Sequence, residues 1–253
     1  FHQFFGENLL RADVCNAVDE LGQLLDHSGP VAASERNAAR IFNCDHLFFV
    51  TNGTSTSNKM VWHSTVAPGD VVIVDRNCHV SILHAITMTG AVPVFLMPTR
   101  NHFGIIGPIP LEEFTWEKIE KKIRANPFAS KSKSKPRILT ITQSTYDGIL
   151  YNVDAIKEKL DGKIDTLHFD EAWLPHATFH KFYHGMHAIG RNRPRTKESV
   201  VFSTQSTHKL LAGLSQASQI LVQDSETRKL DYDTFNEAYL MHTSTSPQYA
   251  IIA

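Results

Sequence analysis

The sequence predicts an α/β domain built on a mostly parallel, doubly wound β-sheet. Short apolar runs of strand length alternate with segments whose apolar residues recur at helical spacing. The 253 residues are enough for one large domain. Hydrophobic residues make up 42% of the chain and charged residues 20%, which are the proportions of a folded globular protein rather than a disordered one.

The predicted elements follow in order from the amino terminus. Helical spacing predicts helices over residues 7–27, 34–42, from about 56 onward, 79–90 and 235–241. Apolar runs predict strands over residues 47–50, 71–75, 92–97, 137–142, 164–169, 199–202 and 219–222. The triplet Ser28-Gly29-Pro30 is expected to break the first helix, and Gly90 to end the helix that starts at residue 79.

Composition and motif searches argue against several classes of protein. The formal net charge of -1 provides no bulk attraction to nucleic acid. No apolar run approaches membrane-spanning length, and no signal peptide opens the sequence. The 14 histidines form no His-Glu-x-x-His pattern, and the three cysteines lack metal-ligand spacing: Cys15, Cys44 and Cys78. We therefore expect a cytoplasmic protein that binds no nucleic acid, membrane or metal.

The segment Thr204-Gln-Ser-Thr-His-Lys-Leu-Leu-Ala-Gly-Leu-Ser-Gln-Ala-Ser218 places Lys209 in a small-residue run with little other charge. Predicted strands lie on both sides of this segment. A lysine held between buried strands is poorly solvated, which lowers its pKa and makes the amine nucleophilic toward an aldehyde. The alternative is a solvated lysine on a polar loop, which is the usual state of this residue.

Asp170 follows the predicted strand over residues 164–169. Ligands of open α/β sheets bind at the carboxyl ends of strands, so an acid there can pair with a cationic group. Lys209 comes about 40 residues later, which leaves room for one further βαβ crossover. This order is the pattern of pyridoxal-phosphate enzymes, in which the aspartate pairs with the pyridine nitrogen and the lysine forms a Schiff base. Taken alone, Asp170 also fits a helix N-cap.

A candidate phosphate loop follows the predicted strand over residues 47–50. Gly53 permits close backbone approach, and Thr54 and Ser55 add hydroxyl donors just before a predicted helix. A helix N-terminus favours a phosphate because its free N–H groups carry partial positive charge. The segment has neither P-loop spacing nor the glycines of a dinucleotide fingerprint. An ordinary capped helix is the alternative.

Six ordered motifs resemble the bacterial ornithine/lysine/arginine decarboxylases, and the likeness runs over the whole chain. The motifs are Thr51-Asn-Gly-Thr-Ser-Thr56, Asp75-Arg-Asn-Cys-His79, Ser144-Thr-Tyr-Asp-Gly148, Phe169-Asp-Glu-Ala-Trp173, the lysine segment Thr204–Ser218 and His242-Thr-Ser-Thr-Ser-Pro247. The resemblance implies a pyridoxal 5′-phosphate-binding, aspartate-aminotransferase-like large domain of fold type I. It also implies that residues 1–253 are a fragment of a protein with an additional N-terminal domain and a C-terminal small domain.

The resemblance assigns further roles by position. It implies that His79 stacks on the pyridine ring, that the small Ala172 leaves room for the other face, and that His208 lies beside the lysine–cofactor imine. It makes Ser206 a phosphate ligand. Ser244 and Thr245 resemble a segment that reaches the phosphate of a neighbouring subunit, which implies at least a homodimer with shared sites. Trp173 is placed against the cofactor, although packing alone also explains it.

The resemblance implies decarboxylation of a basic L-amino acid, either lysine, arginine or ornithine. Lys209 and His208 are the candidates for the acid that protonates Cα, with Asp170 and His79 holding the ring. Another fold-type-I reaction, such as transamination, is one alternative. A non-catalytic, decarboxylase-like regulatory subunit is the second, and the combination of Lys209, Asp170 and the phosphate loop argues against it.

Overall fold

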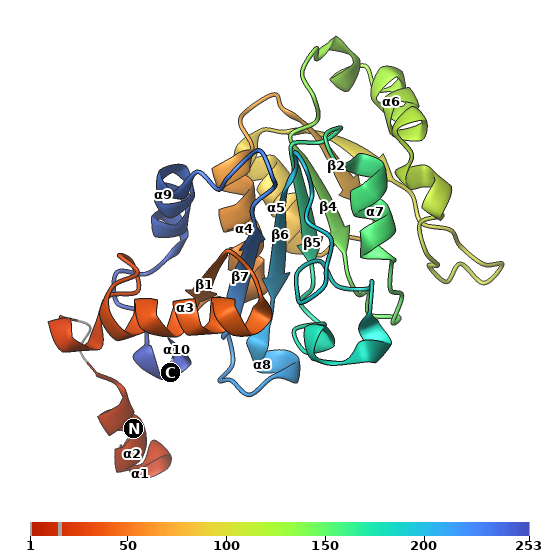
Figure 1. The fold of residues 1–253 in the computed structure, drawn as a ribbon. Helices are drawn as coiled ribbons and strands as arrows, with labels where there is room; N and C mark the ends of the chain where they lie inside the picture. The colour runs from red at the N-terminus through yellow and green to blue at the C-terminus, as the bar shows by residue number, and fades with distance from the viewer. Residues whose placement is uncertain (1, 15–16, 253) are drawn as a thin grey trace.

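The computed structural model describes residues 2–14 and 17–252, and a seven-stranded sheet forms its centre (Figure 1). Its strands are β1 His46–Val50, β2 Val71–Asp75, β3 Val92–Leu96, β4 Ile138–Thr142, β5 Thr166–Asp170, β6 Val200–Gln205 and β7 Ser218–Gln223. They lie in the order β1-β7-β6-β5-β4-β2-β3. All pairs from β6 to β3 are parallel, whereas β7 runs antiparallel to both β6 and β1. The predicted mostly parallel, doubly wound sheet is thus confirmed.

Helices cover both faces of this sheet. They are α1 His2–Phe5, α2 Glu7–Ala12, α3 Gly29–Phe42, α4 Gly53–Thr65, α5 Val80–Thr89, α6 Trp116–Ala125, α7 Val153–Leu160, α8 Thr207–Leu210, α9 Tyr232–His242 and α10 Tyr249–Ile252. Trp62 of α4, Ile82 of α5 and Phe235 of α9 belong to one buried core, while α6 and α7 contribute Ile119 and Ile156 to the other. The sheet is therefore buried on both sides, as expected for parallel strands.

Three predictions about individual elements were wrong. The helix expected over residues 7–27 ends at Ala12, and a 3₁₀ turn over Asp19–Leu21 precedes Gly22. Gly22 has a φ of 73° and lies so close to the Ser28 carbonyl that a Cβ there would come within 2.3 Å of it. The triplet beginning at Ser28 starts α3, because proline is well suited to the first turn of a helix. Two 3₁₀ turns, and no α-helix, connect β5 with the parallel β6.

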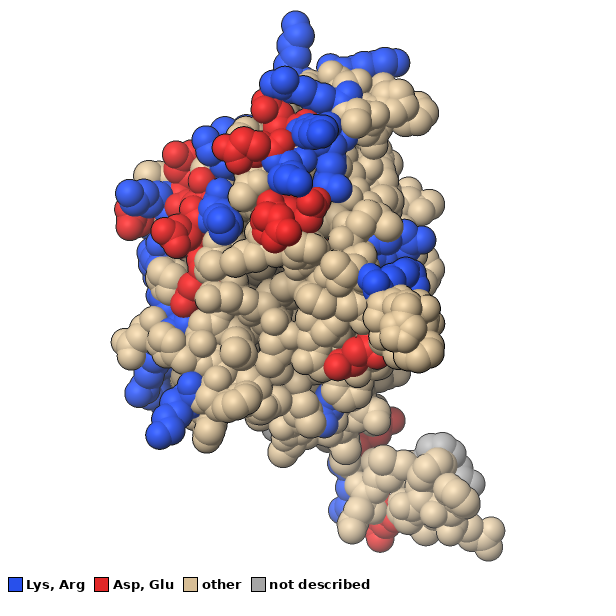
Figure 2. Space-filling model, turned by 90° about the vertical axis from the view of Figure 1, so that its right-hand side faces the viewer, with Lys and Arg blue, Asp and Glu red and all other residues tan. Residues whose placement is uncertain are grey.

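Acidic and basic side chains intermix on the face of the molecule drawn in Figure 2. On α6, for example, Arg124 and Glu120 lie 2.9 Å apart. The helices among the described residues are too short or not apolar enough to cross a bilayer. Across residues 2–14 and 17–252, no three His, Cys, Asp or Glu side chains gather as metal ligands would. Cys15 lies outside the described residues.

The topology brings the ends of several strands and helices to one edge of the sheet. The parallel strands β4, β5 and β6 all have their carboxyl ends there. Helix α5 begins after β2, α4 begins after β1, and the short α8 follows β6 directly. Helix N-termini and strand carboxyl ends therefore surround the same space, which is where open α/β sheets bind their ligands.

Candidate active site

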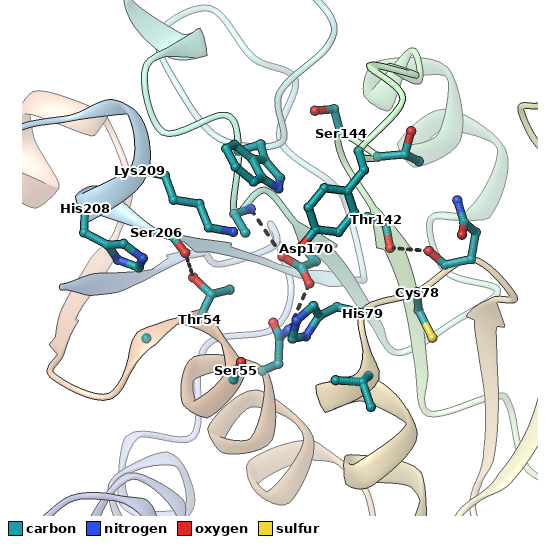
Figure 3. Close-up of a pocket in the computed structure, with 18 of the residues that line it drawn as sticks. Thr54, Ser55, Cys78, His79, Thr142, Ser144, Asp170, Ser206, His208 and Lys209 are labelled. Carbon is teal, nitrogen blue, oxygen red and sulfur yellow. Dashed lines mark hydrogen bonds between the residues drawn. The ribbon is translucent and has the colours of Figure 1, made fainter. Parts of the chain in front are cut away.

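A cavity of about 660 Å³ lies at this edge of the sheet, a volume within the usual range for small-ligand sites. Figure 3 shows its side chains converging from α4, the β2–α5 connection, β5 and α8. Ten of the predicted site residues line the cavity: Gly53, Thr54, Ser55, His79, Asp170, Ala172, Trp173, Ser206, His208 and Lys209. Residues far apart in the sequence thus meet as the motifs predicted.

The start of α4 forms one end of the cavity. The helix begins at Gly53, three residues earlier than expected, so Thr54 and Ser55 lie in its first turn. Gly53 has a φ of 72°, a conformation that glycine adopts without strain, and open space surrounds the position of a Cβ. No side chain caps the helix, which leaves first-turn N–H groups available to an anion. The hydroxyls of Thr54 and Ser206 meet there at 2.6 Å.

Lys209 extends from α8 across the cavity toward Asp170 (Figure 3). Its Nζ lies 4.2 Å from the centroid of the Trp173 ring. Partial burial lowers the pKa of the Lys209 amine, and the carboxylate of Asp170 opposes this shift. The ring of Trp173 therefore contributes directly to the surroundings of the amine and does more than fill the core.

Asp170 is the last residue of β5 and is 3% exposed. It is not a helix N-cap, because a turn rather than a helix follows it. Its Oδ2 accepts a hydrogen bond from Asn58 Nδ2 at 2.9 Å, and its Oδ1 accepts one from the Ala172 amide at 3.2 Å. Burial raises the pKa of Asp170, while the Asn58 bond and the positive potential of His79 and Lys209 act in the opposite direction.

His79 and His208 stand on different sides of the cavity (Figure 3). His79 is the N-cap of α5, and its Nδ1 accepts from the Ser81 amide at 3.2 Å. This cap leaves the imidazole ring at the cavity, beside the Asp170 carboxylate. His208 Nδ1 lies 2.7 Å from the Ala217 carbonyl oxygen, and because a carbonyl can only accept, Nδ1 donates this hydrogen bond.

Ser244 and Thr245 are exposed and do not line this cavity. They follow the end of α9, on a segment whose expected contact is with a second subunit. Several other lining residues had no predicted role, among them Asn58, Asn77, Cys78, Thr142 and Ser215. Asn58 had a readable signal, because it lies one helical turn after Thr54 and therefore on the same face of α4.

The fold has the form of an aspartate-aminotransferase-like large domain. A solved aspartate aminotransferase from Thermotoga maritima is similar in fold alone, with 11% identity and a TM-score of 0.60 over 97% of this chain and 60% of its own. The family model described as Orn/Lys/Arg decarboxylase, major domain, matches residues 1–253. The chain belongs to this family.

Individual relatives agree with that assignment. Lysine decarboxylase LdcA of Pseudomonas aeruginosa is 58% identical over all 253 residues, which cover 34% of that protein. The solved structure of lysine decarboxylase A from Pseudomonas aeruginosa matches with a TM-score of 0.94, covering 100% of this chain and 34% of that one. A biodegradative arginine decarboxylase of Escherichia coli is 43% identical, again with 34% of its length covered. The chain thus spans about a third of the length of these relatives.

Proposed function

We propose that the protein carrying this chain binds pyridoxal 5′-phosphate in the cavity and removes the α-carboxylate of a basic L-amino acid as carbon dioxide. The observation that carries this proposal is the convergence of Lys209 and Asp170 on one cavity with the uncapped start of α4. An amine, a carboxylate and an anion site are the three groups that this cofactor requires. Membership of a decarboxylase family supports the same reaction.

The residues present fit the cofactor from end to end. Thr54, Ser55 and Ser206 supply hydroxyls, and α4 supplies first-turn N–H groups, for the phosphate. Asp170 is placed to accept a hydrogen bond from the ring nitrogen. His79 supplies a flat ring for stacking, and Ala172 leaves the opposite side of the cavity uncrowded.

Each side chain then has a defined task. When bound, the cofactor supplies an aldehyde that condenses with amines and a protonated ring that withdraws electrons from the breaking bond. Lys209 would provide the amine that holds the cofactor. Asp170 keeps the proton on the ring nitrogen, while His79 fixes the plane of the ring. Lys209 or His208 delivers the proton that replaces the carboxylate on Cα.

We propose lysine as the preferred substrate. The support comes from the relatives, since five proteins named lysine decarboxylases are 46–58% identical to this chain. An arginine decarboxylase and an ornithine decarboxylase among the relatives are 43% and 37% identical to this chain. Release of carbon dioxide from lysine, arginine and ornithine, compared at equal concentration, tests this choice. Faster turnover of arginine or ornithine would contradict it.

The deciding experiment substitutes Lys209. We expect Lys209→Ala to abolish carbon dioxide release and to prevent borohydride from fixing the cofactor to the protein, because no other lysine lines the cavity among the described residues. Lys229→Ala is the control, since that lysine is exposed and does not line the cavity. A cofactor still fixed by borohydride in Lys209→Ala, or a keto acid product from the unaltered protein, contradicts the proposal.

We further propose that the chain is the cofactor-binding major domain of a longer protein that acts as a homodimer or a larger homo-oligomer. Its coverage of 34% of each relative leaves room for an N-terminal domain and a C-terminal small domain. The exposed positions of Ser244 and Thr245, outside the cavity of their own chain, support a role at the site of a second copy.

A further inference from the structure

A continuous chain of buried hydrogen bonds connects the interior of the protein to Asp170. Trp62 Nε1 donates to Thr140 Oγ1 at 3.1 Å, and Thr140 Oγ1 lies 3.1 Å from His168 Nδ1. His168 Nε2 lies 3.0 Å from Thr204 Oγ1, which donates to Asn58 Oδ1 at 2.7 Å. All five side chains are fully buried, so solvent cannot substitute for a missing partner.

Asn58 is the branch point of this chain. One of its amide hydrogens is directed at Asp170 Oδ2, and its Nδ2 also lies 3.0 Å from Ser81 Oγ. Ser81 Oγ in turn lies 2.8 Å from His79 Nδ1. A single amide therefore contacts the carboxylate that faces the ring nitrogen and, through one hydroxyl, the imidazole that faces the ring.

The donor and acceptor of each hydrogen bond in this series follow from its two terminal groups, the Trp62 indole and the Asp170 carboxylate. An indole N–H only donates and a carboxylate only accepts, so Asn58 must present its NH₂ to Asp170 and its carbonyl to Thr204. The Thr204 hydroxyl then donates its one hydrogen to Asn58 Oδ1 and must accept a hydrogen bond from His168 Nε2–H. A neutral His168 consequently accepts a hydrogen bond at Nδ1 from the Thr140 hydroxyl. The Thr140 oxygen in turn accepts the hydrogen bond from the Trp62 N–H.

The opposite assignment of donors and acceptors leaves one hydrogen-bond donor without a partner. It would require a protonated Asp170 and a flipped Asn58, with Thr204 donating to His168. Trp62 and His168 would then both donate to Thr140, and the Thr140 hydroxyl hydrogen would find no acceptor among the contacts of the described residues. Burial lowers the pKa of His168 to about 3, which agrees with a neutral ring carrying one proton.

We propose that Asn58 is the positioning residue that fixes the proton arrangement at the cofactor ring. It holds Asp170 as an acceptor for the ring N–H and, through Ser81, holds His79 with its proton on Nε2. Trp62, Thr140, His168 and Thr204 keep the amide of Asn58 in the required orientation. This inference rests on the proposed cofactor. It identifies the residues that keep Asp170, the proposed partner of the cofactor ring nitrogen, in its charged form.

The test compares two ligands in the full-length protein, freed of cofactor. Pyridoxamine 5′-phosphate has the ring nitrogen but no aldehyde, so its affinity reports non-covalent contacts. Its 1-deaza analogue has a C–H group in place of that nitrogen. We expect Thr204→Val to weaken binding of the first ligand about tenfold and that of the deaza analogue less than about threefold, because only the first needs an ionised Asp170.

Two variants serve as controls. Thr204→Ser keeps the hydroxyl and should restore both affinities. Thr89→Val makes the same buried substitution on α5, where the hydroxyl bonds only carbonyls of its own helix, and should change neither affinity. If Thr204→Val does not fold, Asn58→Leu must produce the same selective loss.

Equal weakening of both ligands by Thr204→Val or Asn58→Leu would reveal a structural role and overturn the inference, as would unchanged affinity for both. Failure of the unaltered protein to bind pyridoxamine 5′-phosphate would instead overturn the proposed cofactor, and this inference with it. The two failures are distinguishable because the first requires normal binding by the unaltered protein.

Discussion

At Asp170, burial and hydrogen bonding act in opposite directions on one side chain. Its position at the end of β5 removes it from water, which raises the pKa of the carboxyl. Bonds from Asn58 and from the Ala172 amide favour the ionised form. Without these donors the pKa of the carboxyl would be higher still, and a protonated carboxyl is a weaker acceptor for a ring N–H than a carboxylate is. The protonation state of this residue therefore depends on the neighbours that donate hydrogen bonds to it.

We expect Asp170→Asn to retain the fold and to lower kcat by about 10²–10³-fold, the usual cost of removing one preorganised electrostatic partner. The amide has nearly the shape of the carboxylate but no charge to keep the ring nitrogen protonated. Steady-state decarboxylation, with circular dichroism as the check on folding, measures the effect. Glu171→Gln is the matched control because Glu171 is buried next to Asp170 but pairs with Ser203 and Gln205 instead. Near-normal turnover in Asp170→Asn would remove this acid from the site.

At the residue scale, the sequence predicted the residues that line the cavity better than the residues that hold them in position. Lys209 and Asp170 stand at strand ends in recognisable motifs, and both line the cavity. Asn58 and His168 lie outside the motifs, and Thr204 opens the lysine segment without a predicted role of its own. Their connection depends on the parallel register that sets His168 beside Thr140 and on the packing of α4 against the strands, and neither can be read from one sequence.

At the scale of elements, alternation of strands and helices predicted the sheet well. All seven predicted strands occur, because the sheet is covered on both faces and its strands are therefore mostly apolar. The antiparallel direction of β7 was not predicted, since direction depends on the connection through α8 and the turn before Ser218. The helix predicted over residues 7–27 ends at Ala12 instead, and the close backbone contact of Gly22 with Ser28 further along is not revealed by periodicity.

The segment over residues 243–247 gives a prediction about two subunits. Ser244 and Thr245 follow α9 and are exposed outside the cavity of their own chain, so we expect them to complete the phosphate site of a second copy. Inactive Lys209→Ala protein mixed with an inactive Ser244→Ala/Thr245→Ala protein should then regain activity. A mixed dimer contains one site in which both halves are unaltered, so about a quarter of the full activity is the expected ceiling. No recovery after verified subunit exchange contradicts a shared site.

At the scale of the whole molecule, polar groups in the core link function to stability. The hydrogen-bonded chain through His168 crosses three adjacent strands, β4, β5 and β6, and ends at the site. Such a network stabilises the fold only while every member keeps its protonation state. An imidazole in the middle of the sheet therefore couples the stability of the entire domain to pH.

The expected sign of this coupling follows from the two pKa values. The pKa of His168 is about 3 in the folded protein, against an ordinary value of 6.5, because burial disfavours the charged ring. Between these values the unfolded chain binds more protons than the folded one. The stabilising contribution of neutral His168 is consequently complete above pH 6.5 and is lost progressively as the pH falls toward 3.

We expect His168→Gln to reduce this acid sensitivity. Glutamine does not titrate, and its amide can still donate to Thr204 and accept from Thr140. Between about pH 7 and about pH 5, the unaltered protein should lose about 2 kcal/mol more free energy of unfolding than the variant, since each pH unit below 6.5 costs about 1.4 kcal/mol. Urea unfolding at the two pH values measures the difference. His84→Gln, the same substitution at an exposed position of α5, should keep the pH dependence of the unaltered protein, and a His168→Gln protein that does so too would show that His168 is not the titrating group.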